Sequence, residues 1–344
     1  MAGETPPAAW SFLPPRPRAV SRRRGAAAPA ARPYAGSVTT HPADISTAYR
    51  DAEARLLAEY GLARADDRFV EVPDAGLRLH VIELAGDDRL PVVLLHGMAA
   101  VTAAAVPLIP AFGGRRVIAP DWPGHGLSDA ATIARDGIRT APVAWLDAVL
   151  DDAGIERAHI VGHSMGAQFG LYFALARSAR VASLTVLGAP GVALPGTKAP
   201  FSMRMLALPG LAGLLTRPVT RERYERNSAM TLGPGAVGGW PRELVDCGWY
   251  ASLRPEFRTT APQYYRGLGR RELQLTVEEL AGLQTPVFAL LGEDDVFLDA
   301  ESARAGLASI PGVQVAVVPG GHAPWLNSPV RSAEAVAGFL DSQQ

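Results

Sequence analysis

The chain has 344 residues, of which 48% are hydrophobic, and its 33 basic and 34 acidic side chains leave a formal net charge of −1. This composition fits a globular protein with one large α/β domain and a small insertion. The near-zero charge excludes a field that attracts nucleic acid or an anionic membrane, and no apolar stretch reaches the ~18 residues that span a bilayer. The single cysteine, Cys247, excludes an internal disulfide and is interpreted as a buried thiol.

Residues 1–43 are rich in proline, alanine and arginine and are predicted to form a disordered tail, because such a segment cannot build a core. Within the tail, Ser21-Arg22-Arg23-Arg24 is similar to a twin-arginine start. An export signal needs a continuous apolar region, whereas the segment that follows is short and is broken by Pro29 and Arg32. We therefore expect a cytoplasmic protein, with export as the alternative.

After the tail the chain alternates between helical and strand patterns. Residues 46–60 have apolar side chains at helical spacing, and residues 69–72 and 77–83 alternate as an antiparallel edge hairpin does. Continuous apolar runs follow, separated by helical segments such as 143–150, and such runs suit parallel strands buried on both faces. The runs are 92–95, 117–119, 158–161, 184–187, 287–291 and 313–318. This order predicts an α/β fold class with a doubly wound, mostly parallel sheet.

The first apolar run leads directly into His96-Gly97-Met98. Loops at strand ends commonly carry functional groups because the rigid sheet positions them. The backbone N–H of Met98 is therefore a candidate donor for an oxyanion hole, in which N–H groups stabilise negative charge on a reacting oxygen.

The sequence Gly162-His163-Ser164-Met165-Gly166 stands between a strand run and a helical segment. It matches the nucleophile elbow G-x-S-x-G, a tight turn whose flanking positions need glycine because a Cβ would clash. The turn lifts Ser164 above the sheet, and the dipole of the next helix favours negative charge there. The N–H of Met165 is the second candidate oxyanion donor. His163 is a candidate substrate contact, with structural packing as the alternative.

No strand run appears between residues 191 and 279, and we predict a helical cap there. The remaining parts, 44–190 and 280–344, then form the core. The first cap segment is apolar on most sides and includes Met203 and Leu206, which are candidate substrate contacts. Packing of the cap on the core is the alternative role for these side chains.

A carboxylate cluster follows the apolar run 287–291 and contains Asp294 and Asp295. A carboxylate at the end of a strand can reach one nitrogen of a histidine, fix its tautomer and stabilise its charged form. We favour Asp295 as this acid and keep Asp294 as its rival. The loop 188–192, which follows the preceding strand run, contains no carboxylate and offers no other candidate.

The candidate base is His322, in a glycine-rich loop after the last apolar run. Imidazole suits this role because its pKa lies near neutrality; a loop histidine bonded to backbone is the alternative. Trp325, three residues later, is a candidate substrate contact. The histidines form no metal-ligand spacing, so we expect neither a metal nor another cofactor.

Several ordered stretches between about residues 68 and 342 resemble the α/β-hydrolase fold superfamily, in particular its capped serine hydrolases of carboxylesterase and lactonase type. The stretches are Leu94–Gly97, Ala119–Asp129, Gly162–Gly166, Leu291–Asp295 and Gly320–Leu326. The resemblance implies a cap inserted after the sixth strand, and the family pattern Gly-x-x-Asp places the acid at Asp295. It also implies that His96 and His125 hold loop geometry rather than react.

The sequence differs from several other groups of the superfamily, and these differences favour the carboxylesterase and lactonase type. The loop 96–100 lacks the glycine run of lipases of the His-Gly-Gly-Gly type. Haloalkane dehalogenases and epoxide hydrolases use aspartate as the nucleophile, where this chain has Ser164. The carbon–carbon bond hydrolases of aromatic degradation commonly have asparagine before the serine and a Gly-Pro-Gly loop, where this chain has His163 and no such loop.

The sequence therefore predicts hydrolysis of a small, partly hydrophobic ester or lactone through an acyl-enzyme on Ser164. Two alternatives stay open. One is other chemistry on the same residues, such as carbon–carbon bond hydrolysis, perhydrolysis or a cyclisation; the other is a ligand-binding receptor on a hydrolase fold. The oligomeric state is left open.

Overall fold

The computed structural model describes residues 41–62, 68–134, 136–195, 197, 204–205, 208, 217–233, 240–267 and 270–343. These residues form an eight-stranded sheet in the order β1-β2-β4-β3-β5-β6-β7-β8. The strands are β1 (Arg68–Val72), β2 (Leu77–Leu84), β3 (Asp87–Leu95), β4 (Arg115–Pro120), β5 (Ala158–His163), β6 (Val181–Leu187), β7 (Val287–Gly292) and β8 (Gln314–Val318).

The pairing of the strands confirms the predicted fold class. β2 pairs antiparallel with β1 and with β4, while the strands from β4 through β3, β5, β6 and β7 to β8 are parallel. The predicted edge hairpin is therefore β1 and β2. Every continuous apolar run lies within or overlaps a parallel strand, because strands covered on both faces need apolar side chains in both directions.

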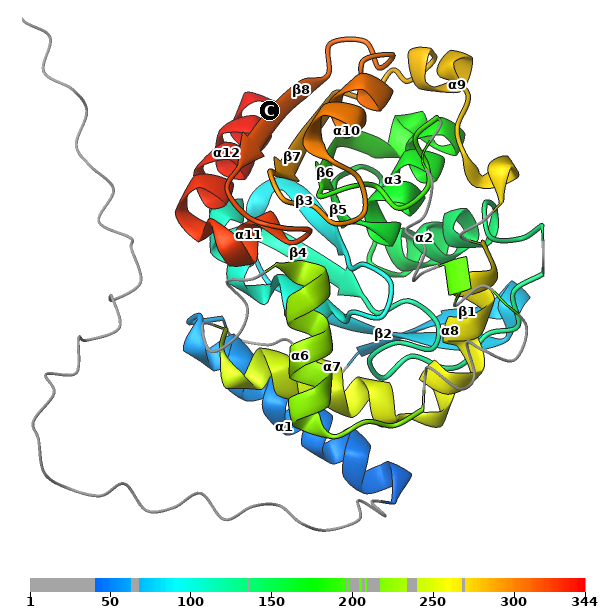
Figure 1. Cartoon of the computed structure of the whole chain (residues 1–344), viewed down its shortest axis with the longest axis vertical. Coiled ribbons are helices and arrows are strands. Elements are labelled where there is room, and N and C mark those ends of the chain that lie inside the picture. The colour runs from blue at the N-terminus through cyan, green and yellow to red at the C-terminus, as the bar shows by residue number, and fades with distance from the viewer. Residues whose placement is uncertain are drawn as a thin grey trace, which may run out of the picture. The chain divides into compact units, whose positions relative to one another are not determined.

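Helices cover both faces of the sheet, and Figure 1 shows α12 and α3 on opposite sides of the strands. One core cluster contains Val93 and Leu95 and packs against α2, α3 and α10; the other contains Val92 and Leu94 and packs against α1, η2 and α12. The core helices are α1 (Pro42–Glu59), η1 (Pro73–Ala75), η2 (Thr102–Phe112), α2 (Ala141–Asp152), α3 (Met165–Ala176), η3 (Ser178–Arg180), α10 (Ala300–Leu307), α11 (Pro324–Asn327) and α12 (Pro329–Ser342).

Helix α1 begins two residues before the predicted start of the core at residue 44. Its first turn explains the difference. Pro42 occupies the first helical position, where a missing N–H costs nothing, and the Nδ1 of His41 accepts a hydrogen bond from the Ala43 N–H at 3.3 Å.

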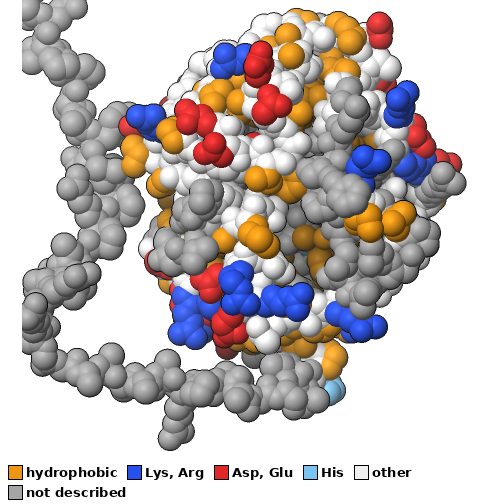
Figure 2. Space-filling model, viewed as in Figure 1, with side chains coloured by type: hydrophobic (Ala, Val, Ile, Leu, Met, Phe, Trp, Pro, Cys, Tyr) orange, Lys and Arg blue, Asp and Glu red, His pale blue; other side chains and the backbone are white. Residues whose placement is uncertain are grey.

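The described residues between β6 and β7, where the cap was predicted, contain helices and no strand. Among the described residues the helices are α6 (Arg221–Leu232), α7 (Arg242–Leu253), α8 (Pro255–Gly267), η5 (Arg271–Leu273) and α9 (Val277–Ala281). Helix α7 packs against α1, α6 and α8. Figure 2 shows basic and acidic side chains side by side on the face seen there, as expected for a net charge of −1. Across the described residues, no helix combines the length and the apolar character needed to cross a membrane.

Candidate active site

Ser164 lies at the turn between β5 and α3, as the elbow pattern predicts. Its backbone has φ 52° and ψ −116°, a strained conformation for a residue with a Cβ. The flanking glycines allow the tight turn: a Cβ on Gly162 would lie 2.7 Å from the backbone of Ala167, and one on Gly166 would lie 2.4 Å from the Leu95 carbonyl oxygen. The elbow therefore holds Ser164 at the carboxyl end of a central strand.

His322 and Asp295 meet in the loops after β8 and β7. The His322 Nδ1 lies 2.8 Å from the Asp295 Oδ2, and both side chains are buried. Asp295 also accepts hydrogen bonds from the N–H groups of Ala189 and Phe297, each at 2.9 Å. Asp294 is exposed instead. The geometry therefore pairs His322 with Asp295 rather than with its rival.

The surroundings of Asp295 favour its ionised form. Burial alone would raise the pKa of this carboxyl, but the facing His322 ring and the N–H groups of Phe297 and Ala189 together hold the pKa below its ordinary value. An ionised Asp295 carries no proton, so it can only accept a hydrogen bond from the His322 Nδ1–H. It thus keeps the His322 proton on Nδ1 and leaves Nε2 as the basic nitrogen.

This lowered pKa predicts a pH-dependent stability contribution. A carboxyl whose folded pKa is depressed stabilises the folded state above its unfolded pKa of about 4, and this contribution is lost as pH falls through the folded pKa. We expect the destabilisation caused by Asp295→Asn, measured by urea unfolding, to be largest near neutrality and to shrink as pH approaches about 3. A difference that stays constant over this range would contradict the assignment.

Met98 and Met165, which carry the candidate oxyanion donors, both line one cavity together with Ser164. A Cβ on Gly97 would lie 3.2 Å from the Ser164 Cβ, so this glycine lets the loop that precedes Met98 approach the elbow. The Met165 N–H begins α3. Neither N–H group takes part in a hydrogen bond with the part of the chain that the structure describes, so both are available to a reacting oxygen.

The remaining predicted contacts separate into three cases. His163 is buried, its Nε2 donates to the His322 carbonyl oxygen at 3.0 Å, and its ring lies against those of His322 and Trp325. Trp325 is buried behind it and donates to the Ala104 carbonyl oxygen, so it supports His163 and borders neither cavity at Ser164. Met203 and Leu206 lie outside the described residues.

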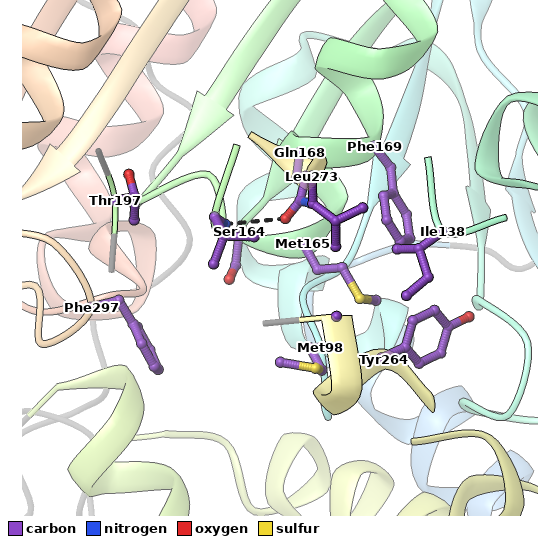
Figure 3. A pocket seen from close by; sticks show the side chains of 13 residues that line it. Met98, Ile138, Ser164, Met165, Gln168, Phe169, Thr197, Tyr264, Leu273 and Phe297 are labelled. Carbon is purple, nitrogen blue, oxygen red and sulfur yellow. Dashed lines mark hydrogen bonds between the residues drawn. The ribbon is translucent and has the colours of Figure 1, made fainter. Parts of the chain in front are cut away.

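Two cavities meet at Ser164, and Met98 and Phe297 line both of them. The inner cavity, drawn in Figure 3, has a volume of about 40 Å³ and mostly apolar walls. The outer cavity has a volume of about 340 Å³ and extends toward α6 and α7. His163 and His322 line the outer cavity only. Side chains that line the inner cavity include Ile138, Met165, Phe169, Tyr264 and Leu273.

Phe297 is a site residue that the sequence reasoning missed. Its ring meets the His322 ring edge-on at 4.2 Å between centroids, and it borders both cavities. The sequence feature that could have indicated Phe297 is its position two residues after Asp295. For the cavity walls on α6 to α8 no such signal exists, since a helical pattern does not show which face a cap turns to the core.

Glu53, His80 and Asp121 form a buried group of metal-ligand residue types between α1, β2 and β4. The Asp121 carboxylate makes two close contacts: its Oδ2 lies 2.9 Å from the His80 Nδ1, and its Oδ1 accepts a hydrogen bond from the Thr102 N–H at 2.9 Å. Burial opposes ionisation, but His80 and His96 hold the Asp121 pKa well below its ordinary value. These contacts tie β2 and the start of η2 to the loop after β4.

Comparison with known proteins agrees with this geometry. The profile of the alpha/beta hydrolase fold family matches residues 91–329. A 2-hydroxy-6-oxononadienedioate/2-hydroxy-6-oxononatrienedioate hydrolase of Cupriavidus pinatubonensis is 29% identical over 278 residues, covering 77% of this chain and 90% of that protein. An uncharacterized carboxylesterase, nap, of Bacillus subtilis is 27% identical over 277 residues, covering 77% of this chain and 83% of that protein.

Among solved structures, naproxen esterase (carboxylesterase NP) of Bacillus subtilis superposes with a TM-score of 0.70 at 22% identity, covering 86% of this chain and 98% of that one. At this identity the likeness concerns the fold alone. Two further relatives are 34% and 37% identical, but over 151 and 134 residues only, so this chain spans 40% and 45% of their lengths.

Proposed function

The chain belongs to the alpha/beta hydrolase fold family, and from this premise we propose that it is a serine hydrolase that cleaves carboxylic esters, lactones included, through an acyl-enzyme on Ser164. The hydrogen bond between His322 and Asp295 beside the strained serine elbow carries the proposal. A nucleophile, an orienting acid and a base that directly follow β5, β7 and β8 of one parallel sheet are the parts that acyl transfer requires.

In the proposed reaction, the Ser164 Oγ attacks the substrate carbonyl carbon and its proton passes to the His322 Nε2. The Met98 and Met165 N–H groups hold the oxyanion of the tetrahedral intermediate. The carbon–oxygen bond then breaks and His322 returns the proton to the leaving alcohol. Water attacks the acyl-enzyme in the same way, which releases the acid and restores Ser164.

Hydrolysis of a carbon–carbon bond is the second candidate, because the Cupriavidus pinatubonensis relative is named as a hydrolase of 2-hydroxy-6-oxo-dienedioates. Two features favour ester hydrolysis over hydrolysis of a carbon–carbon bond. His163 occupies the position before the serine, and its ring is fixed to the His322 backbone rather than free to meet a carbonyl. The loop 96–100 also lacks the Gly-Pro-Gly sequence common in the carbon–carbon hydrolases. Comparing p-nitrophenyl esters with a 2-hydroxy-6-oxo-dienoate as substrates decides between the two.

The position of His322 supports a proposal for which part of the ester each cavity holds. Because His322 must protonate the leaving oxygen, the alcohol occupies the outer cavity, which His322 lines. The acyl group then occupies the inner cavity. A water-sized group takes about 10–15 Å³ of such a volume, so the inner cavity holds roughly three of them. The proposed substrates are therefore short-chain acyl esters of a larger alcohol.

We expect kcat/KM for p-nitrophenyl acetate and butyrate to exceed that for the decanoate by about tenfold or more. The reason is that each methylene group that does not fit into the inner cavity loses about 1 kcal/mol of binding energy. Leu273→Ala should shift the preference toward longer chains, since Leu273 lines the inner cavity. Leu244→Ala removes the same atoms from the outer cavity and should leave the chain-length preference unchanged. Equal shifts in both variants would contradict the assignment of the cavities.

A further inference from the structure

The loop that presents Met98 is a four-residue turn, Gly97–Ala100, hereafter the oxyanion turn. The Ala100 N–H donates to the Gly97 carbonyl oxygen at 3.3 Å and closes it. Ala99, at the third position, has φ 56°, and in the described part of the chain Ser164 is the one other non-glycine residue with a positive φ. Turns of this kind normally place glycine or asparagine there, so contacts from outside the turn must hold alanine in this conformation.

His125, in the loop after β4, supplies such a contact. Its Nε2 accepts a hydrogen bond from the Ala99 N–H at 3.2 Å. Its Nδ1 lies 3.1 Å from the Pro123 carbonyl oxygen, which only accepts, so the proton is on Nδ1. Burial, reinforced by the neighbouring His96, lowers the pKa of His125 to about 3. The ring is therefore neutral at working pH, and the Nε2 lone pair is available to Ala99.

The peptide group between Gly97 and Met98 is held by a second buried histidine, His96. The His96 Nδ1 lies 2.7 Å from the Gly97 carbonyl oxygen, and its Nε2 accepts from the Trp122 N–H at 2.9 Å. Because C=O and N–H point in opposite directions in a trans peptide, fixing the Gly97 carbonyl also fixes the Met98 N–H. The peptides on both sides of the Met98 Cα are thus each bonded to a buried histidine.

The His125 ring is itself fixed by the cap. It lies edge-on to Phe257 at 5.4 Å and beside Tyr264 at 5.6 Å between centroids, and both residues belong to α8. Phe257 lines the outer cavity and Tyr264 the inner one. His125 therefore connects the helix that walls both cavities to the turn that carries the oxyanion donor.

We propose that His125 is a positioning residue that keeps Ala99 in its left-handed conformation and thereby aims the Met98 N–H at the oxyanion. The proposal rests on the proposed function, in which the Met98 N–H stabilises the tetrahedral intermediate. In this role His125 transfers no proton and does not contact the substrate. Its effect belongs to the transition state, because the oxyanion exists there and not in the bound ester.

The test compares His125→Leu with His125→Gln. Both variants lose the ring and its packing on α8, but the glutamine Oε1 can replace Nε2 as the acceptor. With p-nitrophenyl butyrate, His125→Leu should lower kcat about tenfold to a hundredfold, since small misplacements of a catalytic donor cost about that much, while KM stays within about threefold. His125→Gln should recover most of kcat. Inhibition by a trifluoromethyl ketone, whose serine adduct carries an oxyanion, should weaken in parallel with kcat.

Equal losses in the two variants, or no loss in either, would overturn the proposal, because the acceptor would then make no difference. Crystal structures of both variants provide an arm that does not depend on ester hydrolysis: Ala99 should leave its positive φ in His125→Leu and keep it in His125→Gln. If the wild-type protein cleaves no ester, the proposed function fails while this conformational result still decides the role of His125. A positive φ retained at Ala99 in both variants overturns that role.

Discussion

Replacing Ser164 with alanine is expected to lower kcat for ester hydrolysis by roughly 10⁶-fold, since loss of the nucleophile in a serine hydrolase removes the covalent route altogether. The fold should survive. Ser164 makes its described hydrogen bonds through backbone atoms, donating to the Leu187 carbonyl oxygen and accepting from the Gln168 N–H, and alanine retains both. The measurement is kcat with p-nitrophenyl butyrate, beside the Tm of the variant.

Ser302→Ala is the matched control for this variant. Ser302 lies in the first turn of α10, where its hydroxyl bonds to Asp299 on the protein surface, so its loss should change kcat by no more than about twofold. If Ser164→Ala kept more than about a hundredth of the wild-type kcat, turnover would not depend on this serine and the acyl-enzyme would have to be abandoned.

The second large effect is expected for Asp295→Asn, which should lower kcat by about 10⁴-fold. The amide keeps the size of the side chain but cannot hold the proton on the His322 Nδ1, so the wrong tautomer presents an N–H to Ser164. The effect should fall on kcat more than on KM, because Asp295 acts through His322 and lies apart from the bound ester. Steady-state kinetics with one short-chain ester are sufficient.

Asp294→Asn is the control, because it makes the same chemical change one residue away on an exposed side chain. It should change kcat by less than about twofold. The reverse order, with the larger loss in Asp294→Asn, would mean that the loop after β7 rearranges and that the other carboxylate orients His322.

The sequence was sufficient to predict the sheet, and it also indicated three strand ends as the places of the proposed chemistry, for a physical reason. Ser164, Asp295 and His322 each follow an apolar run, and the carboxyl ends of parallel strands lie at one edge of a sheet. Once the runs at 158–161, 287–291 and 313–318 are assigned as parallel strands of one sheet, the loops that follow them lie at the same edge of that sheet. The choice between Asp294 and Asp295 needed either the family pattern or the structure, because adjacent residues in a loop can point in opposite directions.

The walls of the site could not be predicted in the same way. Trp325 follows His322 closely in sequence, but the short helix α11 turns its ring behind His163 and away from the cavities. The hydrogen bond from the Ala99 N–H to His125 joins two loops that are 26 residues apart, and no spacing rule indicates it. Such contacts depend on how loops and cap helices pack, which a strand or helix pattern does not specify.

The most direct test of the account is labelling with a fluorophosphonate, followed by peptide mapping. We expect one adduct, on the peptide that contains Ser164, and none in Ser164→Ala, because a fluorophosphonate reacts with a serine that an adjacent base activates. Absence of the adduct in a protein shown by circular dichroism to be folded, or an adduct on another residue, would contradict the claim that Ser164 is an activated nucleophile.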